Sequence, residues 1–206
     1  MIDITALEKA SYLLGPRRIR KYVLIWCASG TATLVVDENE FELKPNTVIT
    51  ITSGQIHWAK EQAAKGFVLE FTYDFFCKND ADIELIFHNS LFCHFAMNEV
   101  IPLGRSQLVR QELRQIEKEL TETPYQYVIS IHSRIELILV EINRAKIRQI
   151  AADLRTTEAK RLFMYEHLSV KEVAYELGFN DPFYFSNFFK KQTRQSPKAY
   201  REKYSI

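Results

Sequence analysis

Hydrophobic and polar positions alternate in short runs along the first third of this 206-residue chain. β-Branched and aromatic side chains dominate five runs, at 22–27, 31–36, 41–43, 47–52 and 67–72. Turn-forming residues separate the runs at short intervals, as in Ser29-Gly30 and Pro45-Asn46. Runs of this length and spacing predict an antiparallel β unit, either a small barrel or a double-sheet jelly roll, with one face of each strand buried.

The apolar period lengthens in the middle of the chain, where helices are expected. A first apolar series has 4-3-4 spacing, at Val109, Leu113, Ile116 and Leu120. Residues 121–124 break the pattern, and a second series follows at Val128, Ile131, Ile135, Ile138 and Ile142. A period near 3.5 residues predicts two amphipathic helices. The second helix either packs on the chain's own sheet or forms a dimer contact, and the residues alone leave both alternatives open.

Residues 168–191 have the pattern of a helix-turn-helix. Ser169 is a good N-cap, and Glu172 three residues later is its capping-box partner. An apolar stripe at helical spacing follows, at Val173, Ala174 and Leu177. Gly178 ends this helix at a tight corner, because glycine adopts the left-handed conformation at little cost.

A second helix is expected directly after this corner. Asn180 or Asp181 caps it, and Pro182 occupies its first turn, where a missing N–H is harmless. Aromatic residues at i, i+4 spacing turn inward onto the preceding helix, at Phe185 and Phe189. Four residues are left facing outward: Phe183, Ser186, Asn187 and Lys190.

These residues resemble the second helix-turn-helix of AraC/XylS-type bacterial transcription regulators. The family pattern is matched in register at Ala174-Tyr175-Glu176-Leu177-Gly178-Phe179, Asp181-Pro182, Tyr184-Phe185-Ser186, Phe189-Lys190-Lys191 and Ser196-Pro197-Lys198-Ala199-Tyr200-Arg201. The β half is similar to the cupin-like sensor domain of the same family, most closely at 43–47 and 53–57. The resemblance implies an α+β fold: a cupin-like antiparallel β-barrel or jelly roll, a helical pair, and an all-α helix-turn-helix region.

The resemblance also implies three functional parts. Residues 1–103 are expected to form the sensor domain, residues 104–150 a helical dimerisation region and residues 151–206 the DNA-binding region. An antiparallel helix pair commonly makes the dimer in this family. We therefore predict a homodimer whose contacts include Val128, Ile131, Ile135, Ile138 and Ile142.

The chain departs from the family pattern because it has room for one helix-turn-helix, where the family usually has two. The predicted dimer helix runs to about Arg148, and 157–163 already resembles the linker helix before the second unit. Only 149–156 lie between them, whereas a helix-turn-helix needs roughly 20 residues. We therefore predict that the first unit is missing, that a monomer binds DNA weakly, and that a dimer recovers affinity by presenting two copies.

A second departure is Arg194, which stands where the family usually has glycine after the recognition helix. A residue with a Cβ in the left-handed region costs about 1 kcal/mol. We predict a strained corner at this position, or a guanidinium that adds a phosphate contact.

The outward face of helix 182–193 carries the predicted DNA contacts. Phe183, Ser186 and Asn187 lie near its start, where a recognition helix reaches base edges in the major groove. Asn187 can pair with adenine, and Phe183 can contact a thymine methyl group. The predicted set is completed by Tyr184 and by four residues suited to phosphates: Lys190, Lys191, Lys198 and Arg201. Plain solvent exposure is the alternative for each residue.

Charge and cysteine content agree with this division. Residues 144–206 carry 13 Lys and Arg against 7 Asp and Glu, whereas residues 1–143 carry 14 against 19. The positive end is the helix-turn-helix end, which suits a protein that meets phosphate there. The cysteines, Cys27, Cys77 and Cys93, form no metal or redox motif and are expected to be reduced. Without a leader or membrane-spanning segment, a cytoplasmic location is expected.

The β half offers little catalytic chemistry. Cupin enzymes hold a metal with several histidines and a glutamate, but His57 stands alone, so we expect no metal, no cofactor and no enzyme activity. The remaining histidines are expected in helical context, at His88, His94, His132 and His167. A small-molecule effector is the open possibility here, bound by Trp26, His57 and Trp58, although barrel-mouth aromatics are as often core residues.

The sequence leaves two alternative functions open. The first is a sequence-specific regulator that dimerises through residues 105–148 and binds double-stranded promoter DNA through residues 169–201. The second is a sensor and dimerisation protein that lacks specific DNA binding and pairs with full-length relatives. A cupin enzyme is disfavoured because the metal ligands are missing.

Overall fold

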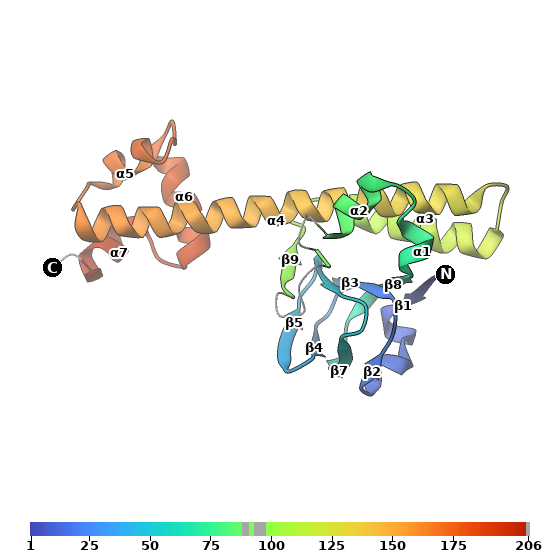
Figure 1. Ribbon diagram of the computed structural model, residues 1–206. Coiled ribbons are helices and arrows are strands. Elements are labelled where there is room, and N and C mark those ends of the chain that lie inside the picture. Colours follow the sequence, from blue (N-terminus) through green and yellow to red (C-terminus); the bar gives the residue numbers. More distant parts are fainter. Residues whose placement is uncertain (88–90, 93–97, 205–206) are drawn as a thin grey trace. The chain divides into compact units, whose positions relative to one another are not determined.

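The computed structural model describes residues 1–87, 91–92 and 98–204. The chain divides into two compact units, residues 1–146 and residues 147–206, and each is described by itself (Figure 1). Three residues that the sequence analysis named, His88, Cys93 and His94, lie outside the described residues. Cys27 and Cys77 are unbridged.

The N-terminal unit contains two antiparallel sheets. The five-stranded sheet has the order β1 (Ile2–Ala6), β8 (Lys65–Phe71), β3 (Tyr22–Ser29), β6 (Thr47–Ile51) and β9 (Val100–Pro102). The four-stranded sheet has the order β2 (Arg17–Arg18), β7 (Ile56–Gln62), β4 (Ala32–Val36) and β5 (Asn39–Leu43). The predicted antiparallel β unit and the α+β fold class are therefore confirmed.

Strand alternation sends the side chains of β3 to two different cores. Val23 and Ile25 point between the sheets, into a core that two short 3-10 helices, η1 (Leu7–Lys9) and η2 (Ser11–Leu14), complete with Leu7 and Leu13. Leu24 lies on the opposite face, in a second core beneath the helices. Because side chains alternate with a period of two, one strand serves both cores.

Helices α1 (Tyr73–Phe76) and α2 (Asp80–Phe87) follow β8 in the chain, and α3 (Leu108–Glu122) and α4 (Tyr127–Tyr165) follow β9. Helix α3 runs alongside the first part of α4 (Figure 1). The two helices place their apolar residues against the outer face of the five-stranded sheet. Charged contacts also join them, since Arg134 Nη1 lies 2.6 Å from Glu112 Oε2 and Ser130 Oγ donates to Glu119 Oε1 at 2.7 Å.

Helix α4 is longer than the sequence pattern predicted. We expected a helix ending near Arg148, but the helix continues through 149–156 to Tyr165. The segment contains no glycine or proline, and most of its residues propagate a helix at low cost. The part of the chain between Tyr127 and Tyr165 is therefore a single helix and holds no further helix-turn-helix.

The C-terminal unit consists of the end of α4 and three short helices: α5 (Val170–Glu176), α6 (Pro182–Thr193) and α7 (Pro197–Tyr204). Its core is apolar and strongly aromatic, and its fully or almost fully buried members are Ala159, Leu162, Phe163, Val173, Ala174, Phe185 and Phe189. The last turns of α4 thus supply the surface on which α5 and α6 pack.

Candidate nucleic-acid interface

The start of α5 is fixed by a complete capping box. Ser169 Oγ accepts from the backbone N–H of Glu172 at 3.2 Å, and Glu172 Oε2 accepts from the backbone N–H of Ser169 at 2.8 Å. Hydrogen bonding to Ser169 lowers the pKa of the Glu172 carboxyl below its ordinary value. The predicted cap is confirmed.

The corner between α5 and α6 depends on Gly178. This residue has a φ of 76°, in the left-handed region that side chains disfavour. Its N–H donates to Tyr175 O at 3.0 Å, and the N–H of Phe179 donates to Ala174 O at 2.9 Å. An added Cβ would meet no atom within 4 Å, so backbone conformation rather than space favours glycine here.

Helix α6 starts as predicted, at a capped proline. Asp181 is the N-cap, and its Oδ1 accepts from the backbone N–H of Phe183 at 2.9 Å. Pro182 follows as the first helical residue. These two residues set the direction in which the helix leaves the corner.

The inner face of α6 is pinned by aromatic packing. Phe185 and Phe189 are fully buried and lie against Phe163 of α4, with ring centroids 6.2 and 5.6 Å away. The Phe163 and Phe189 rings meet edge to face, an arrangement that aromatic quadrupoles favour. This packing fixes the rotation of α6, and so decides which of its residues face outward.

The outer face of α6 is open to solvent. Phe183 is 67% exposed and Tyr184 is 69% exposed, with their rings edge to face at 6.1 Å. Asn187 and Lys190 are exposed on the following turns. Ser186 is half-buried, and its hydroxyl donates to Pro182 O at 2.8 Å. The hydroxyl proton is therefore already hydrogen-bonded within the helix.

The remaining predicted phosphate contacts are less uniform. Lys191 is exposed, and Lys198 is highly exposed, with its Nζ 3.9 Å from Glu202. An exposed pair at that distance contributes little. Arg201 is half-buried, and its charge lies close enough to Glu172 to lower the pKa of that carboxyl further.

Arg194 has the left-handed backbone that its position predicted. Its φ is 63°, and its N–H donates to Lys190 O at 2.9 Å, which closes the last turn of α6. Thr193 supports the corner, because its hydroxyl donates to Phe189 O at 2.8 Å. The residue thereby ends α6, with its side chain exposed to solvent.

Sequence reasoning missed two exposed residues of α5. Tyr175 is about half exposed, and the Lys171 ammonium lies 6.0 Å from the centroid of its ring. Both precede the corner and belong to the same helix-turn-helix as Phe183. The signal was present in the helical period, since Lys171 and Tyr175 are the outward neighbours of the buried Val173 and Ala174.

The three predicted effector residues of the N-terminal unit do not converge. Trp26 lies in the core beneath the helices, where it stacks on Phe67 and its Nε1 donates to Asn46 at 3.3 Å. His57 pairs with Val36 and points between the sheets, whereas Trp58 pairs with Val35 on the opposite face of β7. The three side chains therefore do not face one shared pocket, because strand alternation places neighbouring residues on opposite faces. Their role in effector binding stays a prediction.

His57 is a buried core histidine. Its Nδ1 donates to Gln55 O at 3.2 Å, and its Nε2 is buried without a hydrogen-bond partner in the described structure. Burial is the main cause that lowers the pKa of this imidazole below 6.5. Burial between the sheets thus favours the neutral form of the ring.

A cluster of titratable groups that the sequence did not reveal joins α2 to α4. Asp82, His132 and Glu136 place one ligand-type atom each within 4.8 Å of one another. His132 Nε2 donates to Phe76 O at 2.7 Å and lies 3.2 Å from Asp82 Oδ2, whereas Nδ1 lies 3.6 Å from Glu136 Oε2. The two ring nitrogens thus lie near two different carboxylates. We interpret the cluster as a structural contact that links α2 to α4.

Four of the five side chains predicted as dimer contacts are buried within the protomer. The core beneath the helices fully buries Ile131, Ile135, Ile138 and Ile142. Val128 is 43% exposed. These four residues therefore follow the other alternative that the pattern left open, packing on the chain's own sheet. The exposed apolar residues of this part of α4 are instead Val128, Ile129 and Leu137.

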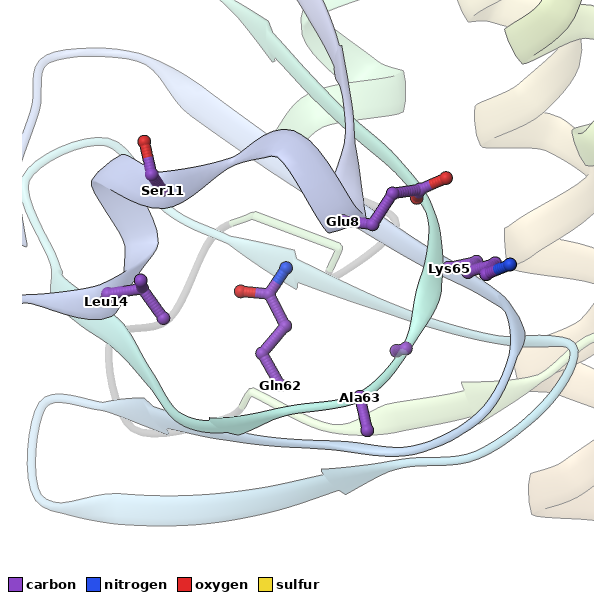
Figure 2. Close-up of a pocket in the computed structure, with 7 residues that line it drawn as sticks. Glu8, Ser11, Leu14, Gln62, Ala63 and Lys65 are labelled. Atoms are coloured by element: carbon purple, nitrogen blue, oxygen red, sulfur yellow. The ribbon is translucent and has the colours of Figure 1, made fainter.

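Two surface hollows lie on the N-terminal unit. One of about 320 Å³ lies between the 3-10 helices and the end of β7, with Ser11 and Leu14 on one side and Gln62 on the other (Figure 2). The other, of about 390 Å³, is lined by Arg18, Ile19, Arg20 and Gly54. Trp26, His57 and Trp58 line neither hollow. Within the described residues, no helix is both long and apolar enough to cross a membrane.

Comparison with known proteins matches both units. A 53-residue segment is 40% identical to an HTH-type transcriptional regulator of Pseudoalteromonas carrageenovora, covering 26% of this chain and 31% of that protein. A 51-residue segment is 39% identical to the HTH-type transcriptional regulator GlxA of Rhizobium meliloti, covering 25% of this chain and 16% of GlxA. The matched segments thus span less than a third of these relatives.

Among solved structures, ToxT from Vibrio cholerae is 14% identical with a TM-score of 0.34, covering 100% of this chain and 99% of ToxT. The AraC-like transcriptional activator CuxR is 12% identical with a TM-score of 0.37, covering 90% of this chain and 66% of CuxR. A family model described as a helix-turn-helix domain matches residues 138–203, and the AraC-like ligand binding domain matches residues 3–123. Because the second model covers more than half of the chain, the protein belongs to the AraC family.

Proposed function

We propose that the protein is a sequence-specific DNA-binding transcription regulator that reads the major groove with α6. The observation that carries the proposal is the outward face of this helix. Phe183, Asn187 and Lys190 are exposed there, while the opposite face is locked by buried phenylalanines. A rigid helix whose outer face carries aromatic and polar side chains near its start, with lysines in its last turn, has the geometry with which such motifs reach base edges and phosphates.

Each outward residue has a defined role in this proposal. Asn187 pairs with adenine, Phe183 contacts a thymine methyl group, and Ser186 and Tyr184 flank these contacts. The phosphate-facing set is Lys190, Lys191, Lys198 and Arg201. Phosphate contacts provide affinity and register, whereas the base contacts provide sequence preference.

The test is fluorescence anisotropy of the full chain on the DNA upstream of its own gene, compared with random duplex across a salt series. Replacing Asn187 and Lys190 by alanine together should weaken specific binding at least tenfold, since a good base contact contributes about 1–3 kcal/mol. A matched control replaces Gln115 and Lys118, an exposed amide and an exposed lysine on α3, and should bind like the unchanged chain. Equal loss in both variants would contradict the groove assignment.

The described structure contains one helix-turn-helix, and this observation keeps a second function in view. With few phosphate contacts, the chain would bind DNA weakly in salt. If it binds its own upstream region no better than random duplex, the protein acts instead as a sensor and dimerisation protein that pairs with full-length relatives. A subunit-exchange experiment with a tagged relative would then show mixed dimers.

We further propose that residues 1–103 act as an effector-sensing part, residues 104–150 as the dimerisation region and residues 151–206 as the DNA-binding region. The protein would act in the cytoplasm, without catalytic activity. The exposed apolar residues Val128, Ile129 and Leu137 support a homodimer contact on α4, because unpaired apolar surface gains free energy on burial. Replacing Ile129 and Leu137 by glutamate should convert a dimer to a monomer in analytical ultracentrifugation.

A further inference from the structure

Cations crowd one edge of the N-terminal unit. Four of the five residues at 17–21 are basic, although residues 1–143 as a whole carry an excess of acidic groups. The segment is held along β7, with Arg17 opposite His57 and the N–H of Gly54 donating to Ile19 O at 2.9 Å. Its side chains alternate between half-buried and exposed, so the cations form an inner and an outer layer.

The inner layer shares a single carboxylate. Glu70 is almost fully buried, and its two oxygens lie 2.9 Å from Arg17 Nη1 and 3.1 Å from Lys21 Nζ. The Arg17 guanidinium also lies 4.3 Å from the centroid of the Tyr12 ring. Two cations against one anion leave the inner layer with a net positive charge, in a partly enclosed setting where charge is screened less than in water.

No carboxylate among the described residues pairs with the outer layer. Arg18 Nε donates to Gly54 O at 2.7 Å, which anchors the guanidinium and leaves its outer nitrogens available. Arg20 is exposed and has no ion-pair partner in the part of the chain that the structure describes. The nearby Asp37 accepts instead from the N–H of Ile56 at 3.0 Å and from the Gln55 amide at 2.8 Å.

These two arginines line the 390 Å³ hollow together with Ile19 and Gly54. Gly54 has a φ of 94°, and no atom lies within 4 Å of the position that its Cβ would take. The backbone on that side is therefore open to close approach. The hollow thus combines an accessible backbone with two guanidinium groups that form no ion pair with the described residues.

We propose that this hollow binds a small organic anion through its carboxylate or phosphate group. The planar fork of a guanidinium matches both groups and can bond them with two parallel N–H donors. Anchoring of Arg18 before binding reduces the ordering cost. The positive inner layer adds attraction from behind. The site belongs to the N-terminal unit alone, and its assignment does not depend on DNA binding.

The charged groups of the other hollow explain why we assign the anion to the Arg18 hollow. The 320 Å³ hollow has Glu8 and Lys65 on its border, so its charged groups cancel (Figure 2). The Gln62 amide within it already donates to Leu7 O. A hollow with one charge of each sign offers an anion no net attraction, whereas the Arg18 hollow does.

The test is isothermal titration calorimetry of the full chain, without DNA, using inorganic phosphate and succinate as probes at constant ionic strength. The R18Q/R20Q variant should bind at least about tenfold more weakly, because charge-assisted bidentate bonds are lost. The R110Q/R114Q variant is the matched control: it removes two exposed arginines of α3 from the same unit, and it should bind within about twofold of the unchanged chain. The single R20Q variant removes no ion pair within the described residues and should show an intermediate loss.

Binding of one or both probes that fails in R18Q/R20Q but persists in R110Q/R114Q supports the proposal, and the preferred probe identifies phosphate or carboxylate as the recognised group. The proposal is overturned if neither probe binds, or if both double variants lose affinity equally. It is also overturned if neither probe binds while R18Q/R20Q weakens binding to DNA, because the surface would then belong to a nucleic acid. Loss of DNA binding elsewhere in the chain leaves these titrations unchanged.

Discussion

The two units of the protein use charge in opposite ways. In the N-terminal unit, charged groups are drawn inward, as Glu70 is between Arg17 and Lys21 and as Arg134 is beside Glu112. In the described part of the C-terminal unit, no charged side chain is buried, and the cations of α6 remain in solvent. Buried charges need their partners, so they fix the fold locally. Exposed cations keep their binding capacity for a ligand outside the chain, which is what a DNA-reading surface requires.

The comparison can be tested because the two units have separate spectroscopic reporters. Both tryptophans of the chain, Trp26 and Trp58, belong to the N-terminal unit. Tryptophan fluorescence therefore follows that unit alone. Far-UV circular dichroism follows the helices of both units, so a transition seen only by dichroism belongs to the C-terminal unit.

The largest effect is expected from Phe189→Ala. Phe189 is fully buried against Phe163 and Phe185, and removing a buried phenylalanine ring costs about 3–5 kcal/mol. The C-terminal unit should unfold early in a thermal melt followed by circular dichroism, while the tryptophan transition stays unchanged. The control is Phe183→Ala, since Phe183 is exposed and should not alter the melt. Early loss of the tryptophan signal would mean that the units do not unfold separately.

Glu70→Gln should have the next largest effect, now on the N-terminal unit. The substitution leaves Arg17 and Lys21 without their anion, and breaking a fully buried pair costs about 3–5 kcal/mol. Both cations are partly exposed, so we expect about 2–3 kcal/mol. Urea unfolding followed by tryptophan fluorescence measures the loss. Glu42→Gln is the control, because its pair with Lys44 is exposed on both sides and should contribute under about 1 kcal/mol.

The regions around Phe189 and Glu70 also differ in how much of their structure could be predicted from the sequence. The features around Phe189 depend on residues close together in the chain: the Ser169 and Glu172 cap, the glycine at 178 and the aromatic pair four residues apart. Signals of this range are complete within one or two helical turns, and each was confirmed. The antiparallel β unit was confirmed for the same reason, from runs and turns.

The features around Glu70 required contacts that the sequence pattern does not display. Glu70 and Lys21 are 49 residues apart, and His132 and Asp82 are 50 residues apart. Only strand pairing and helix packing bring them together. Long-range packing also decided the fate of the predicted dimer residues. The apolar period predicted a buried stripe on α4, but it could not tell whether the chain's own sheet or a partner subunit buries that stripe. The orientation of Trp58 could not be predicted for the same reason, because the pairing of β7 with β4 decides which face of the sheet carries its side chain.

A third difference between the units should appear on mild acidification. Burial lowers the pKa of His57, so the unfolded chain takes up a proton near pH 6.5 while the folded chain resists it. Stability of the N-terminal unit should therefore be constant above pH 6.5 and should fall below it. His57→Leu should remove much of this dependence in the tryptophan-detected melt. His167→Gln, an exposed change in the C-terminal unit, should leave it in place.

The C-terminal unit should respond at lower pH, through its capping box. The Ser169 hydrogen bonds lower the pKa of Glu172, so their stabilisation is present above pH 4.5 and is lost as the pH falls through the folded-state value. Ser169→Ala should cost about 1 kcal/mol at neutral pH and should reduce this acid dependence. Ser169→Asp keeps a capping oxygen and should melt like the unchanged chain in circular dichroism. An equal loss for both variants would show that the hydroxyl is not the stabilising group.

The smallest effect is expected at Arg194. Backbone conformation favours glycine at this position, whereas the proposed phosphate contact needs the guanidinium. Its left-handed backbone costs about 1 kcal/mol, so Arg194→Gly should gain stability by less than that amount, since glycine also loosens the unfolded chain. Arg194→Ala keeps the Cβ and should gain nothing in the same melt. If the guanidinium contacts phosphate, both variants should lower the slope of DNA affinity against salt by about one counterion, although only one is more stable. An unchanged slope in both variants would leave the strain without a binding role, and glycine would simply suit this corner better.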